Sequence, residues 1–202
     1  MRSSPIPLFL VPILPSLPTV HISVSESNSF NSVFFSCSGS SIVLNSKSLV
    51  EKSFWKSLYD NKVTNFGGVP YTYSILERIS LDKFNLKYLR YTTQAGGKLN
   101  KITAKNILNK YENLNIKLCI MYGAAEATAR MSYLPFCDVK NKISSIGKPI
   151  KGGKFFIIGQ NKKKIIKPNI IGELYYKGKN VCLGYANNYK DLSKGDTNKG
   201  LL

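Results

Sequence analysis

Histidine, arginine and acidic residues are scarce in this sequence of 202 residues. His21 is the only histidine and lies in a Ser-rich stretch, which argues against a Ser-His-Asp or Cys-His catalytic site. No two cysteines form a Cys-x-x-Cys pair, so the spacing that holds zinc is absent. Because nothing in this pattern demands an oxidising compartment, we expect a cytoplasmic protein.

Acidic residues number 11 against 29 Lys and Arg, which gives a net charge of +18. Such an excess is typical of a polyanionic partner, namely nucleic acid, an anionic membrane or a nucleotide. Arginine, the better reader of DNA bases, is rare, and Lys162–Lys164 is the one tight lysine run. Dispersed lysine is typical of a solvated surface, so we expect no specific nucleic-acid binding.

Long uninterrupted hydrophobic runs are also missing. No run reaches the roughly 20 apolar residues that span a bilayer, so we expect no membrane span. Prolines interrupt the apolar stretch between residues 5 and 18, and that density is incompatible with a helical signal segment. We therefore expect residues 1–40 to be a poorly ordered or degraded N-terminal segment.

Apolar runs and helical patterns alternate over residues 41–122, within an α/β part that we expect over residues 41–150. The patterns predict strands over 42–44, 62–66, 86–93 and 116–121. They predict helices after a Ser48–Glu51 capping box, over 71–79, and after a cap at Asn100. This order predicts an α/β fold, a partial parallel sheet with covering helices, whereas residues 123–150 look irregular.

Residues 151–202 favour a mainly antiparallel β subdomain. Turn residues separate short stretches of β-forming residues, and the predicted strands are 154–158, 165–166, 174–176 and 181–183. The run Lys162–Lys164 is expected at a hairpin tip.

The residues that follow the predicted strand 116–121 are the strongest candidates for a ligand site, because ligands usually bind at the carboxyl ends of strands in open α/β sheets. Tyr122 offers a flat ring to a purine, and Gly123 lets the backbone approach a ligand. Glu126 supplies the hard oxygen that Mg²⁺ prefers. Taken singly, such residues are equally typical of a core or a solvated surface, so the pattern leaves both interpretations open.

The stretch from Cys119 to Pro135, CIMYGAAEATARMSYLP, resembles the nucleotide motif of the AMP-forming acyl-adenylating superfamily, the acyl-CoA synthetases and related AMP-dependent ligases. Four further segments resemble motifs of that family in the same order, namely Phe66–Tyr71, Leu89–Gly97, Ser145–Pro149 and Gly172–Tyr185. The resemblance implies a piece of the large N-terminal domain of an adenylate-forming enzyme.

The resemblance also implies a reaction. A carboxylate attacks the α-phosphorus of ATP, and the acyl-adenylate then passes its acyl group to a thiol such as CoA or phosphopantetheine. By position, Gly96 and Gly97 would line the adenine and acyl pocket, and Tyr122, Gly123 and Ala125 would border the nucleotide. Glu126 would hold Mg²⁺ and is the candidate catalytic residue.

The sequence departs from the family pattern in ways that predict inactivity in isolation. Ala125 stands where the family has a threonine that meets phosphate. Ser36–Ser41 imitates the phosphate loop without its lysine, and the sequence ends at Leu202, before the expected ribose-binding aspartate and the C-terminal domain with its catalytic lysine. We therefore expect an internal piece of a ligase.

Three alternatives remain open from the sequence. The chain is a nucleotide-binding pseudoenzyme, one subunit of a split ligase whose partners are the missing parts, or a basic nucleic-acid-binding protein. The last alternative predicts clustered Arg and Lys with exposed aromatic residues, whereas the lysines here are dispersed.

Overall fold

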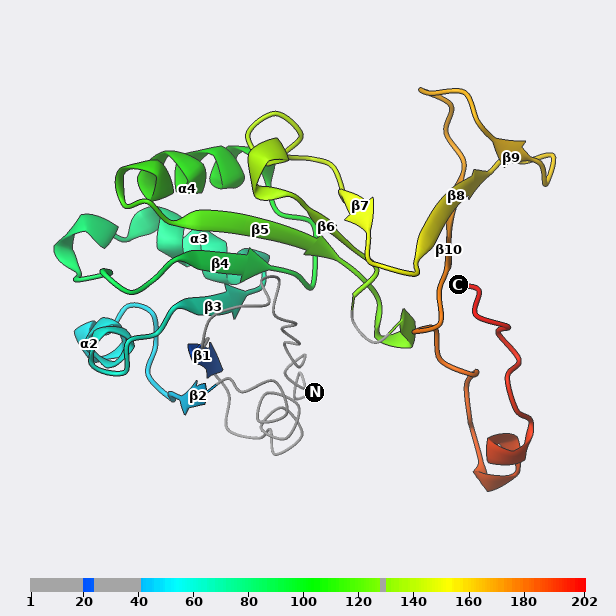
Figure 1. Cartoon of the computed structure of the whole chain (residues 1–202), viewed down its shortest axis with the longest axis horizontal. Helices are drawn as coiled ribbons and strands as arrows, with labels where there is room; N and C mark the ends of the chain where they lie inside the picture. The colour runs from blue at the N-terminus through cyan, green and yellow to red at the C-terminus, as the bar shows by residue number, and fades with distance from the viewer. Residues whose placement is uncertain (1–19, 24–40, 128–129) are drawn as a thin grey trace. The chain divides into compact units, whose positions relative to one another are not determined.

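A computed structural model describes residues 20–23, 41–127 and 130–202 (Figure 1). These residues form two compact units. The first unit contains the described residues up to Ile120 together with Leu134–Ser145, and the second contains Met121–Tyr133 and Ile146–Leu202. The expectation for residues 1–40 lies outside the described residues, apart from strand β1 at Val20–Ser23. The domain boundary expected at residue 150 stays a prediction.

The first unit is built on parallel strands. Their order is β2-β1-β3-β4-β5, and every neighbouring pair is parallel. Besides β1, the strands are β2 (Ser41–Leu44), β3 (Asn65–Gly68), β4 (Tyr91–Gln94) and β5 (Lys117–Tyr122). The helices are α2 (Lys52–Asp60), α3 (Pro70–Arg78) and α4 (Lys101–Asn113), and α3 packs beside α4 against the sheet (Figure 1). The predicted α/β class is confirmed.

Local signals explain where the helices begin. The side chain of Asn100 accepts hydrogen bonds from the backbone N–H groups of Ile102 and Thr103, which confirms the predicted cap of α4. Before α2, the carboxylate of Glu51 accepts from the backbone N–H of Ser48 at 2.8 Å, which is one half of the predicted capping box. Pro70 occupies the first turn of α3, where its missing N–H costs nothing.

Two predicted strands begin later than expected. The backbone N–H groups of Lys62 and Val63 bond back to the carbonyls of Tyr59 and Leu58, so this stretch closes α2 and β3 starts only at Asn65. Likewise Leu89 donates to the carbonyl of Leu86, and this turn delays β4 to Tyr91. The strand predictions over 62–64 and 86–90 were wrong because turn hydrogen bonds satisfy these backbone groups.

The core of the first unit combines aromatic packing with one buried polar network. Phe54 and Trp55 of α2 meet Phe66 of β3 edge to face. Deeper in the unit, the hydroxyl of Tyr73 donates a hydrogen bond to Oγ1 of Thr92 at 3.0 Å. The hydroxyl of Thr92 in turn donates to the hydroxyl oxygen of Tyr111 at 3.1 Å. These buried hydroxyl groups satisfy one another and join α3, β4 and α4.

The second unit is mainly antiparallel, as predicted. Strand β8 (Lys154–Ile158) lies between β9 (Lys164–Ile165) and β10 (Glu173–Lys177), and both pairings are antiparallel. Lys162 has a positive φ of 59° in the turn closed by Gly159 and Lys163, which confirms Lys162 and Lys163 at the predicted hairpin tip, whereas Lys164 begins β9.

Two expectations for the second unit were wrong. The stretch 123–150 contains two short antiparallel strands, β6 (Ser132–Leu134) and β7 (Lys148–Pro149). Residues 181–183 form no strand, because the backbone N–H of Cys182 bonds to the carbonyl of Glu126. In the described part of the chain, none of the helices combines the length and apolar character of a membrane span.

Candidate nucleotide site

Two of the family-like motifs meet within the first unit. The register aligns Gly68, Gln94 and Ile120, so the loops after β3 and β4 leave the sheet at the same edge. Ala95 donates its N–H to the carbonyl of Gly68 at 3.2 Å. The buried side chain of Gln94 donates through Nε2 to the carbonyl of Gly97 at 2.8 Å, which holds the second loop against its own strand.

Gly96 and Gly97 pack against the Val-Pro segment that precedes α3. Gly96 has a φ of +79°, and a Cβ there would lie 3.1 Å from Cγ1 of Val69. A Cβ on Gly97 would lie 3.2 Å from Cγ of Pro70. Both glycines are exposed on their other side. The close approach of two loops therefore requires glycine here, independently of any ligand.

The remaining predicted residues lie in the second unit. Tyr122 ends β5, its side chain is 38% exposed, and its ring centroid lies 6.4 Å from that of Phe155. Gly123 and Ala125 are exposed, and Ala125–Ala127 form the short 3-10 helix η2. The loop thus presents a partly open aromatic ring and accessible backbone, as a nucleotide-binding loop requires.

Glu126 carries the charge of this loop. Its Oε1 accepts a hydrogen bond from the hydroxyl of Tyr185 at 2.6 Å. This hydrogen bond is the main reason that the pKa of Glu126 is lowered from its usual value, so the carboxylate keeps its charge at neutral pH. The same hydrogen bond raises the pKa of Tyr185.

Asn180 holds the other end of the loop. Its Nδ2 donates to the carbonyls of Ala127 at 2.7 Å and Arg130 at 3.0 Å, while its Oδ1 accepts from the hydroxyl of Tyr176 at 2.9 Å. No role for Asn180 or Tyr185 was predicted from the sequence. The available signal was their place in the segment Gly172–Tyr185, which resembles a family motif.

A magnesium site fits these residues only in part. The described residues contain no cluster of three or more His, Cys, Asp or Glu side chains that could hold a metal ion. Mg²⁺ with a nucleotide, however, commonly uses one or two carboxylates together with phosphate oxygens and water. The ionised, partly exposed carboxylate of Glu126 meets that requirement.

The structure brings Tyr122, Gly123, Ala125 and Glu126 together on one loop of the second unit. Gly96 and Gly97 belong to the first unit. That the residues of both units contact one nucleotide stays a prediction.

The fold is that of a part of the N-terminal domain of adenylate-forming enzymes. The chain belongs to the family of AMP-binding enzymes, whose family model matches residues 17–186. Among solved structures, the N-terminal domain of FACL13 from Mycobacterium tuberculosis matches with a TM-score of 0.70 at 16% identity, covering 86% of this chain and 44% of that one. O-succinylbenzoate coenzyme A synthetase from Bacillus subtilis also reaches 0.70, at 20% identity, over 92% of this chain and 39% of that one.

Similarity to characterised proteins supports the same family. Luciferin 4-monooxygenase of Luciola mingrelica is 30% identical over 77% of this chain and 27% of its own length. The 4-hydroxybutyrate–CoA ligase 1 of Metallosphaera sedula is 30% identical over 65% of this chain and 22% of its own length. The chain thus spans about a quarter of the length of these relatives.

Proposed function

We propose that this chain contributes part of the nucleotide site of a cytoplasmic, ATP-dependent ligase that activates a carboxylic acid as an acyl-adenylate. The observation that carries the proposal is the set of hydrogen bonds from Tyr185 to Glu126 and from Asn180 to Ala127 and Arg130. These hydrogen bonds join two of the segments that resemble family motifs. The relatives include a CoA ligase by name, and the o-succinylbenzoate enzyme is known in complex with an acyl-adenylate.

Each site residue has a defined role in this proposal. Tyr122 borders the adenine ring, with Phe155 behind it. The backbone at Gly123 and Ala125 approaches the phosphates, and Gly96 with Gly97 lines the adenine and acyl pocket. Glu126 would hold Mg²⁺, which supplies positive charge to the phosphate oxygens when it is bound. The acceptor is a thiol such as CoA or phosphopantetheine.

We further propose that the chain by itself activates no carboxylate. Ala125 has no hydroxyl to meet phosphate. The loss of one hydrogen bond to a charged group costs about 1.5–3 kcal/mol. Catalytic groups that act together in a transition state contribute non-additively, so the loss of several leaves little activity. The phosphate-loop lysine, the ribose-binding aspartate and the catalytic lysine would come from the other parts of a longer or split ligase.

Titration calorimetry of the purified chain with ATP, with and without Mg²⁺, tests the site. Glu126→Gln should abolish the gain in affinity that Mg²⁺ provides. The matched control is Glu173→Gln, because Glu173 also accepts a hydrogen bond from a tyrosine hydroxyl, that of Tyr175. Equal effects of both substitutions, or no nucleotide binding at all, would overturn the assignment.

Exchange of radioactive pyrophosphate into ATP, in the presence of a panel of carboxylic acids, tests the second proposal. Nucleotide binding without exchange is the expected result. Exchange by this chain alone would show that the chemistry does not need the missing groups.

A further inference from the structure

A second surface lies outside the nucleotide site, on the hairpin β8–β9 and the loop that follows it. We name it the lysine–isoleucine surface, and it consists of Lys162–Lys164, Ile166, Lys167, Ile170 and Ile171. Ile166 is 89% exposed and Ile171 is 97% exposed. None of the predicted site residues belongs to this surface.

Isoleucine side chains at this exposure are energetically unfavourable unless a partner covers them, because their apolar area stays in contact with water. Single exposed hydrophobic residues are common on protein surfaces. Here, however, Ile166, Ile170 and Ile171 gather on one loop around the turn at Pro168 and Asn169.

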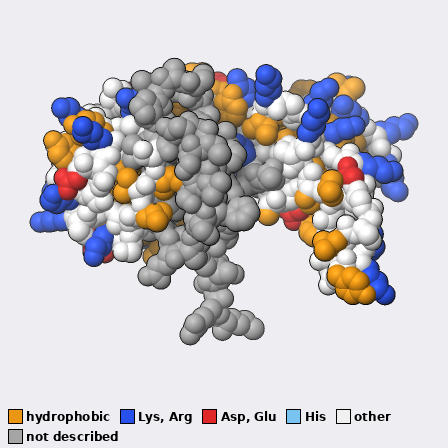
Figure 2. All heavy atoms as spheres, turned by 60° about the horizontal axis from the view of Figure 1, so that its bottom comes forward, with side chains coloured by type: hydrophobic (Ala, Val, Ile, Leu, Met, Phe, Trp, Pro, Cys, Tyr) orange, Lys and Arg blue, Asp and Glu red, His pale blue; other side chains and the backbone are white. Residues whose placement is uncertain are grey.

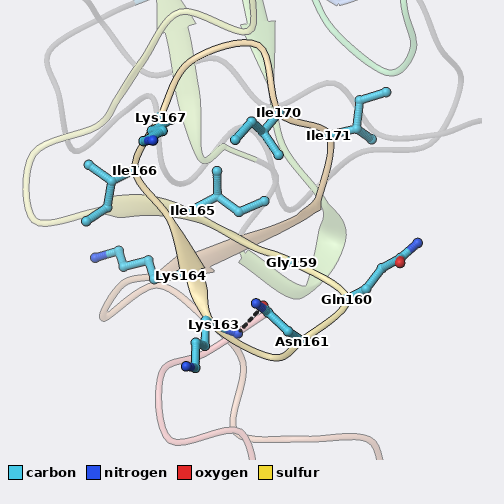
Figure 3. Close-up of a pocket in the computed structure, with 10 residues that line it drawn as sticks. All are labelled: Gly159, Gln160, Asn161, Lys163, Lys164, Ile165, Ile166, Lys167, Ile170 and Ile171. Atoms are coloured by element: carbon cyan, nitrogen blue, oxygen red, sulfur yellow. Dashed lines mark hydrogen bonds between the residues drawn. The ribbon is translucent and has the colours of Figure 1, made fainter.

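The loop has an inner and an outer side (Figure 3). Ile165 and Ile170 point toward the space enclosed by the loop, where the lining residues surround a volume of about 770 Å³. Ile166 projects outward beside Lys164, and Ile171 points away from the opposite end of the loop. Ile166 and Ile171 also border this space, but their high exposure leaves both side chains free to meet another surface.

The charge around the loop has one sign. Residues 151–180 contain eight lysines and one acidic residue, Glu173. Within the described parts of the chain, none of the salt bridges involves Lys162, Lys163, Lys164 or Lys167. In Figure 2, blue lysine side chains crowd this end of the second unit beside orange hydrophobic ones. The ammonium group of Lys164 lies 5.2 Å from the ring centroid of Phe156. Four lysines without an acidic partner in the described structure, next to exposed aliphatic groups, favour an anionic partner with an apolar interior.

We propose that the lysine–isoleucine surface docks the protein on an anionic lipid membrane. The isoleucines enter the boundary between headgroups and acyl chains, and the lysines reach the lipid phosphates. A nucleic acid would use the lysines but would leave the isoleucines in water. This docking is peripheral and independent of the nucleotide chemistry proposed above.

Co-sedimentation of the full chain with vesicles tests the proposal. Binding is expected to vesicles of phosphatidylcholine mixed with phosphatidylserine, to weaken as salt is added, and to be lost with phosphatidylcholine alone. Each lysine near an anionic surface contributes about a fivefold change in affinity. Equal binding to neutral vesicles, or no binding to the anionic ones, would overturn the proposal and would leave an acidic protein partner for this surface.

Substitutions separate this surface from the general charge of the chain. Changing Lys162, Lys163, Lys164 and Lys167 together to Gln should weaken vesicle binding on the order of several hundredfold, at about fivefold for each lysine. The control changes Lys52, Lys98, Lys101 and Lys105 to Gln, which removes the same charge from exposed positions of the first unit. An equal loss in the control would show that net charge alone attracts the vesicles and would overturn the proposed surface.

The isoleucines need their own test. Ile166→Ser with Ile171→Ser should also weaken vesicle binding by about tenfold, because two aliphatic groups no longer enter the lipid. Ile102→Ser is the control, since Ile102 is 68% exposed beside Lys101 on α4. Circular dichroism of each variant verifies folding. Undiminished binding by the folded Ile166 and Ile171 variant would contradict insertion.

Discussion

The hydroxyl of Tyr185 donates a hydrogen bond to Oε1 of Glu126 over 2.6 Å, although the two residues lie 59 positions apart in the sequence. The backbone N–H of Cys182 reaches the carbonyl of the same glutamate. The candidate ligand loop after β5 is therefore held by a segment from near the end of the chain, and the orientation of its carboxylate depends on a tertiary contact.

Tyr185→Phe should raise the pKa of Glu126 toward its usual value, because it removes the main group that lowers this pKa. The lowered pKa stabilises the fold above the pKa of the unfolded chain, near 4.5, and this contribution is lost as the pH falls through the folded-state value. NMR titration of the Glu126 carboxyl measures the shift. Tyr71→Phe, at a tyrosine that is 73% exposed, is the control. An unchanged titration of Glu126 in Tyr185→Phe would mean that the hydrogen bond does not form in solution.

Asn180→Ala should destabilise the second unit by about 1–3 kcal/mol, because the carbonyls of Ala127 and Arg130 and the hydroxyl of Tyr176 lose a partner. Hydrogen exchange of the amides near Met131 should quicken with the drop in thermal stability. Asn141→Ala, at an exposed position, should leave both measurements unchanged. Equal stability of the two variants would contradict the role of Asn180 in holding the loop.

Gly96→Ala should cost about 1–2 kcal/mol from its left-handed backbone, with an additional cost from the contact with Val69. Gly152→Ala separates the two contributions, because Gly152 also has a positive φ, of +86°, but has nothing within 4 Å of an added Cβ. Chemical denaturation compares the two. A smaller loss at Gly96 than at Gly152 would show that the loop relaxes away from Val69.

Thr92→Val should destabilise the first unit by about 1–3 kcal/mol, because Thr92 links the buried hydroxyl groups of Tyr73 and Tyr111. Thr93→Val is the control. Its Oγ1 is buried and has no hydrogen-bond partner in the described structure, so its removal should be neutral or stabilising. Urea unfolding of both variants measures the difference, and the reverse order of stability would contradict the network.

The two tyrosines of this network also predict a pH dependence. Burial is the main cause that raises the pKa of both Tyr73 and Tyr111. Their stabilising contribution is complete below the unfolded-state pKa of about 10 and is lost as the pH rises above it. Ultraviolet titration should therefore show that Tyr73 and Tyr111 ionise only when the chain unfolds, as should Tyr176, whose pKa is also raised mainly by burial. Early ionisation of all tyrosines in the folded protein would overturn this prediction.

Features that depend on neighbouring residues could be predicted from the amino-acid sequence. Asn100 caps α4 through N–H groups two and three positions ahead, and this contact is available as soon as the chain turns. Alternating apolar patterns also indicated the α/β class and the later antiparallel sheet, because each period selects one backbone conformation. The motif at Cys119–Pro135 indicated the family, and with it Tyr122 and Glu126.

Contacts between residues far apart in the sequence depend on the complete fold. Nothing local to Asn180 or Tyr185 shows that they contact the loop after β5, because these hydrogen bonds close over 50 and 59 positions of chain. The starts of β3 and β4 were also missed from the sequence. Val63 and Tyr88 are residue types that favour strands, yet the backbone groups around them are satisfied by turns that pack Leu58 and Leu89 into the core. Burial of apolar groups and completion of backbone hydrogen bonds, summed over the whole fold, override the local preference.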